Sequence, residues 1–81
     1  MDMLDIVMAH AVVIREHINT QCAPGIISSV HRRNDRTIII NVDCERGSYE
    51  LEFRKIKVDV IMINDNIYTY GKDGWTHLCR I

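Results

Sequence analysis

The chain has little proline or glycine and no excess of charge of either sign. Its 81 residues include one proline and four glycines, and 10 lysine and arginine residues face 11 aspartate and glutamate residues. Collagen-like and low-complexity chains need far more proline and glycine, and disordered chains need fewer apolar residues than the 47% present here. We therefore expect an ordered globular chain, and the length predicts a single domain over residues 1–81.

Close cysteine pairs are also missing. The three cysteines, Cys22, Cys44 and Cys79, are odd in number and widely spaced, which is not a disulfide framework. Zinc sites usually take their ligands in close pairs such as Cys-x-x-Cys, so we expect no metal and no other cofactor. A secretory signal needs a basic N-terminal region where this chain has acidic residues, and no apolar run is long enough to span a bilayer. These absences predict a reduced, cytoplasmic protein with no membrane contact.

One amphipathic helix is predicted over residues 2 to about 19. Apolar residues recur there at steps of three and four, which places them on one face of a helix. Pro24 and Gly25 end it. The predicted buried stripe comprises Leu4, Val7, Met8, Ala11, Ile14 and Ile18.

Five or six antiparallel strands are predicted between about residue 26 and residue 81. Turn-forming pairs or clusters separate the apolar runs, at 34–35, 45–48, 65–66 and 71–74. The fold class is therefore α+β, with the N-terminal helix packed on an antiparallel meander sheet that would alternatively close into a small barrel. The predicted core face of the sheet comprises Ile38, Ile40, Val42, Tyr49, Leu51, Phe53, Ile56, Val58, Val60 and Met62.

The alternation of apolar residues changes phase between residues 53 and 56. Apolar residues are odd-numbered up to Phe53 and even-numbered from Ile56. A hairpin turn at Arg54-Lys55 would bring Phe53 opposite Ile56, whereas a β-bulge would keep one continuous strand. Turn chemistry favours the bulge, because tight turns prefer Asn, Asp or Gly. The pairing of apolar residues favours the hairpin, which we take as the slightly better interpretation.

An apolar and aromatic patch is predicted on the sheet face away from the helix. Pairing around the last two turns brings together Ile61, Ile63, Tyr68, Tyr70 and Trp75, with His77 and Cys79 at the edge. The outer face of an antiparallel sheet is normally polar, so this patch is either covered or used. The alternatives are burial inside a barrel, a protein interface, or a platform on which nucleobases stack.

Basic residues gather in two clusters. Arg32, Arg33 and Arg36 surround the first predicted turn, and Arg54, Lys55 and Lys57 lie at the change of phase. Both clusters suit phosphate contacts. Basic residues at strand edges also guard against aggregation, and the whole chain is slightly acidic, which argues against nucleic-acid binding.

We expect a non-catalytic protein–protein interaction domain. The sequence has no glycine-rich phosphate loop and no nucleophile elbow, and so small a domain has little room for a substrate pocket. The domain would act as a regulator or inhibitor, such as a viral or mobile-element accessory protein, through the aromatic patch, with a homodimer as one form of that contact. The alternative is a nucleic-acid-binding module that uses the two basic clusters.

Overall fold

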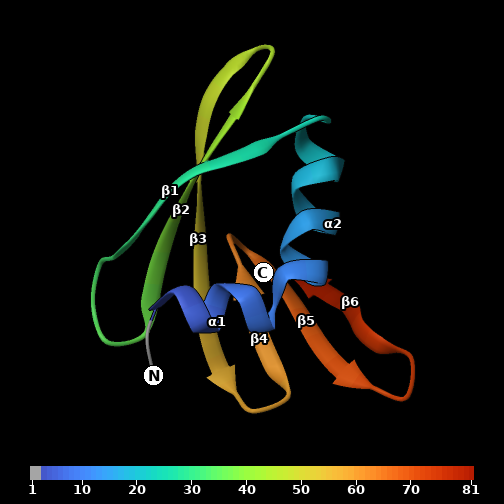
Figure 1. The fold of residues 1–81 in the computed structure, drawn as a ribbon. Helices are drawn as coiled ribbons and strands as arrows, with labels where there is room; N and C mark the ends of the chain where they lie inside the picture. The colour runs from blue at the N-terminus through green and yellow to red at the C-terminus, as the bar shows by residue number, and fades with distance from the viewer. Residues whose placement is uncertain (1–2) are drawn as a thin grey trace.

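Two helices and six strands form the fold in a computed structural model of the chain, which describes residues 3–81 (Figure 1). The elements are α1 (Met3–Ala9), α2 (Ala11–Gln21), β1 (Ile26–Arg32), β2 (Thr37–Cys44), β3 (Gly47–Lys57), β4 (Val60–Ile63), β5 (Asn66–Gly71) and β6 (Gly74–Arg80). Each strand pairs antiparallel with the next, in the order β1 to β6. The α+β class and the meander are confirmed, and the sheet is not closed into a barrel.

A break at His10 divides the predicted helix in two, so the expectation of one helix is wrong. The His10 ring Nδ1 donates to the carbonyl of Ile6 at 2.8 Å, and its backbone N–H donates to Val7 at 3.2 Å. The two helices meet at a steep angle, with α1 across one end of the sheet and α2 along it (Figure 1). The predicted start at Asp2 lies outside the described residues.

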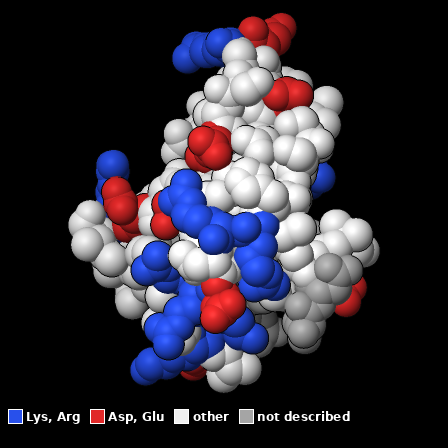
Figure 2. Space-filling view, turned by 90° about the vertical axis from the view of Figure 1, so that its left-hand side faces the viewer, with Lys and Arg blue, Asp and Glu red and all other residues white. Residues whose placement is uncertain are grey.

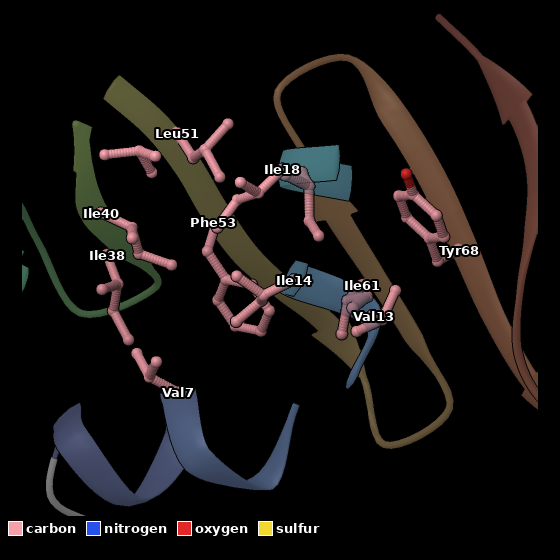
Figure 3. Close-up of a cluster of buried hydrophobic side chains, with 12 residues drawn as sticks. Val7, Val13, Ile14, Ile18, Ile38, Ile40, Leu51, Phe53, Ile61 and Tyr68 are labelled. Atoms are coloured by element: carbon pink, nitrogen blue, oxygen red, sulfur yellow. The ribbon is translucent and has the colours of Figure 1, made fainter. Parts of the chain in front are cut away.

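The two helices cover the same face of the sheet and bury one apolar core. Figure 3 shows side chains of α1, α2 and the strands converging between these layers. Because the break at His10 turns α1 relative to α2, part of the predicted stripe misses the core, and Leu4, Met8 and Ala11 are exposed. The buried core comprises Val7, Val13, Ile14, Ile18, Ile38, Ile40, Val42, Leu51, Phe53, Ile61, Ile63 and Tyr68.

The change of phase is a β-bulge and not a hairpin, so our slightly preferred interpretation is wrong. Strand β3 runs unbroken through Arg54-Lys55, and its pairing with β4 shifts between Lys55, opposite Ile61, and Lys57, opposite Val60. Arginine and lysine rarely adopt the positive φ that a two-residue hairpin turn needs, and the chain turns instead at residues 58–59.

The bulge decides which residues of β4 enter the core. Residues directly opposite each other in a sheet share a face, and Phe53 lies opposite Ile63. The odd-numbered residues of β4 are therefore buried, and the predicted core positions Ile56 and Val58 are exposed. Val60 and Met62 are only half-buried.

Candidate functional site

The two basic clusters lie at the same end of the sheet, although they are far apart in the sequence. In an antiparallel meander every second turn falls at the same end, so the β1–β2 and β3–β4 turns are neighbours (Figure 1). Arg32 ends β1 and lies opposite Ile38, and Phe53 of β3 lies on the other side of Ile38. Lys55 and Lys57 then follow Phe53 along β3. The meander thus joins both clusters into one surface.

We define this surface, the basic end, as Arg32, Arg33, Arg36, Arg54, Lys55 and Lys57. Lysine and arginine side chains gather over one side of the molecule there, around a few acidic ones (Figure 2). An open hollow of about 320 Å³ lies between its cations and has apolar walls that include Ile6, Ile38 and Phe53. Arg32, Arg36, Lys55 and Lys57 line this hollow together with Asp35.

Glu52 neutralises part of the basic end. Its carboxylate lies 3.3 Å from Arg33 and 3.7 Å from Arg54. The Arg54 Nε also donates to the Thr37 hydroxyl at 3.3 Å, which holds this guanidinium along the sheet. Two of the six cations are therefore already paired.

The other four cations of the basic end are available to an external anion. The Arg32 guanidinium donates to the backbone carbonyl of Asp35 at 3.2 Å. Within residues 3–81, Arg32, Arg36, Lys55 and Lys57 form no ion pair. All four are exposed. Lys55 lies opposite Ile61 just before the bulge, and Lys57 lies opposite Val60 just after it.

The predicted aromatic patch does not lie on the face away from the helices, so that placement is wrong. Ile61, Ile63 and Tyr68 are buried with the helices against them. The physical reason is the bulge, because it keeps the odd-numbered residues of β4 on the core face. The pairings of Tyr70 with Trp75 and of Tyr68 with His77 are as predicted.

The rest of the patch is divided. Trp75 is half-buried and packs on the core, with its ring centroid 5.3 Å from that of His10. Tyr70 is 58% exposed, and His77 is exposed and contacts Asn66 at 3.0 Å. These residues do not form a continuous apolar surface, because Ile61, Ile63 and Tyr68, which would connect them, are buried in the core.

His17 and Tyr68 form a buried polar pair that the sequence patterns did not reveal. The His17 Nδ1 lies 2.8 Å from the Tyr68 hydroxyl, and the His17 Nε2 is buried with no hydrogen-bond partner among residues 3–81. Burial, and then the nearby charge of His77, lower the pKa of His17. Both residues line an open groove of about 1150 Å³ between α2 and the C-terminal strands. The sequence held one indication that His17 is buried: it directly precedes Ile18 and lies on the side of the helix that faces the core.

The cysteines and histidines are not assembled into a metal site among residues 3–81. Cys22 and Cys44 line a hollow of about 300 Å³ with Arg46 and Tyr49, whereas Cys79 is exposed on β6. Neither helix within residues 3–81 combines the length and apolar character needed to cross a membrane.

Comparisons with known proteins add no identification. No protein family, curated protein or solved structure matches the chain.

Proposed function

We propose that the protein is a non-catalytic nucleic-acid-binding module that contacts the phosphate backbone through the basic end. The observation that supports this proposal is the convergence of two basic clusters on one hollow, with four cations left without an ion pair among residues 3–81. Phosphate contacts of this kind depend on charge and not on base sequence. Because phosphate contacts carry no sequence information, we expect little sequence preference.

The charges are partly separated between the two ends of the sheet, despite the net charge of -1. Asp43, Glu45 and Asp65 lie at or beside the β2–β3 and β4–β5 turns, at the end opposite the basic end, together with Arg46. Asp35 and Asp59 lie in the turns of the basic end, where the basic residues outnumber them. A partial separation of this kind can orient a molecule toward a polyanion before contact, even when its total charge is near zero.

The test compares two double variants with the same loss of charge. Lys55→Gln with Lys57→Gln removes two cations of the basic end. Arg15→Gln with Arg46→Gln removes two exposed cations elsewhere, because Arg15 is on α2 and Arg46 is in the β2–β3 turn at the opposite end of the sheet. Fluorescence anisotropy with a short labelled DNA duplex measures the affinity at several salt concentrations. We expect the first variant to bind at least about tenfold more weakly, with a salt slope smaller by about 2. Equal losses in both variants would contradict a defined surface.

Glu52→Gln makes the basic end more positive, whereas the lysine variants make it less positive. It releases Arg33 and Arg54 from their shared carboxylate and removes one negative charge. We expect the affinity for the same duplex to rise about two- to fivefold, the range that exposed ion pairs are worth. An unchanged affinity would mean that these two arginines lie outside the contact.

A second candidate is docking of a protein strand on the edge of β6. Within the described chain β6 pairs only with β5, and residues 76–80, which include Leu78, are exposed. An unpaired edge with exposed apolar side chains favours strand addition, including by a second copy of this chain. Light scattering after size exclusion tests the second copy: a mass near 9.4 kDa is that of one chain and would exclude the dimer.

A further inference from the structure

Two cysteines from separate elements share one hollow at the end of the molecule opposite the basic end. Cys22 directly follows α2, and Cys44 is the last residue of β2. Both line the hollow of about 300 Å³, together with Arg46 and Tyr49. Both thiols are partly exposed, so a small reagent can reach them.

The backbone around Cys22 is held close to β2. Its N–H donates to the carbonyl of Ile18 at 3.0 Å, which closes the last turn of α2. A Cβ on Gly25 would lie 2.5 Å from the Ile18 Cγ2 and 3.0 Å from the Val42 Cγ1, so the chain crosses β2 at a distance that only glycine permits. The end of α2 and the end of β2 are therefore fixed beside each other.

The groups in this hollow affect each other's ionisation. The adjacent Cys44 thiol is the largest cause that raises the pKa of Cys22, followed by burial, and Arg46 acts in the opposite direction. Burial, then Cys44 and Cys22, raise the pKa of Tyr49, whose hydroxyl is buried and has no hydrogen-bond partner in the described chain. Both thiols thus lie within interaction range of each other and of the same tyrosine.

We propose that Cys22 and Cys44 form a site of thiol–disulfide exchange, which reacts with low-molecular-weight disulfides such as glutathione disulfide. One cysteine thiolate attacks a sulfur of glutathione disulfide and releases one glutathione thiolate. The second thiolate attacks the sulfur of the first cysteine, forms the Cys22–Cys44 bond and releases the second glutathione. The protein dithiol loses two electrons, one glutathione disulfide gains them, and the two cysteine protons pass to the two glutathione thiolates.

The bond would close a loop that carries part of the basic end. Residues 23–43 include β1, its turn and the cations Arg32, Arg33 and Arg36. A cross-link removes conformational freedom from the unfolded loop, so the thermal midpoint should rise, by about 20 °C for a loop of this length in a small domain. Strand β1 is an edge strand, and its amides should exchange more slowly in the oxidised protein.

The experiment treats the folded protein with glutathione disulfide at about pH 8.5, where thiolates form. Trypsin then separates the three cysteines, because arginine or lysine precedes each resulting peptide: 16–32 holds Cys22, 37–46 holds Cys44 and 73–80 holds Cys79. We expect peptides 16–32 and 37–46 to be joined and two hydrogens lighter than their sum. Cys79 is exposed on β6 and does not line the hollow of Cys22 and Cys44, so it should carry glutathione as a stable adduct.

Two matched variants complete the test. Cys22→Ser should leave a persistent glutathione adduct on Cys44 and no thermal shift, whereas Cys79→Ser should cross-link as the wild type does. The proposal is overturned if the wild type carries stable glutathione on both Cys22 and Cys44, or if both remain reduced while Cys79 reacts.

Discussion

His17 is a histidine buried among the core side chains, with 3% of its surface exposed. Its Nδ1 is bound to the Tyr68 hydroxyl, and within the part of the chain that the structure describes its Nε2 is buried without a hydrogen-bond partner. A second proton on this ring would place a charge between α2 and the sheet, and no carboxylate of the described residues is bound to it. Burial and the neighbouring His77 therefore lower the pKa of His17, and the folded protein favours the neutral ring.

The lowered pKa of His17 predicts that stability falls on acidification. Below pH 6.5, the ordinary pKa of histidine, the unfolded chain binds a proton that folded His17 resists, so the free energy of unfolding decreases until the lowered pKa is reached. The contribution is at most about 1.4 kcal/mol per pH unit. Urea unfolding at a series of pH values measures it. We expect His17→Gln to reduce this dependence and His31→Gln, at an exposed site, to leave it unchanged; equal slopes in both variants would refute the assignment.

At the scale of elements, the bulge in β3 determines the whole C-terminal half of the sheet. Without it, the even-numbered residues of β4 would face the helices and a continuous apolar patch would lie on the outer face. With it, Phe53 and Ile63 share the core face, and Ile61 lies opposite Tyr68 on that face too. A shift of one residue exchanges the two faces of a strand, so a single unpaired position moved three predicted interface residues into the core.

Trp75 and Tyr70 are cross-strand partners on the last hairpin that differ in burial. Trp75 packs against the core beside His10, whereas its cross-strand partner Tyr70 is mostly exposed. We expect Trp75→Ala to lower the free energy of unfolding by about 2–4 kcal/mol and Tyr70→Ala by less than about 1 kcal/mol. Urea denaturation followed by far-UV circular dichroism measures both. Similar small losses in both variants would contradict the packing of Trp75 on the core and indicate that it belongs to an exposed patch, as the sequence predicted.

The sequence patterns predicted the class of the fold, the antiparallel order of its strands and the residue pairing of the last hairpin for identifiable physical reasons. The pairing predicted across Arg54-Lys55 is wrong. Helical spacing ended at Pro24-Gly25, and turn residues separated the strands. The break at His10 depends on a local contact of its ring with the carbonyl of Ile6, which no periodicity records. The bulge was one of two open alternatives, because the hydrophobic pattern of Phe53 and Ile56 fits either geometry.

At the scale of the whole molecule, the meander turns two local charge clusters into one surface. Each cluster was visible in the sequence. Whether it forms a binding site was not, since nearby acidic residues and the balanced total charge favoured a solvent-exposed strand edge without a partner. The fold settles which cations are paired among the described residues: Glu52 holds Arg33 and Arg54 and leaves the other four. The predicted protein-docking patch was continuous in the sequence-based prediction but is divided in the fold, because its central residues are packed in the core.

The central claim is that this basic end binds the phosphate backbone of nucleic acid. The most direct measurement is the affinity of the wild-type protein for a short DNA duplex between about 50 and 200 mM salt. Four phosphate contacts predict a slope of about −3.6 for the logarithm of the binding constant against the logarithm of salt concentration, a loss of roughly 100-fold over that range. No binding at the lowest salt concentration, or an affinity that does not change with salt, would contradict the account.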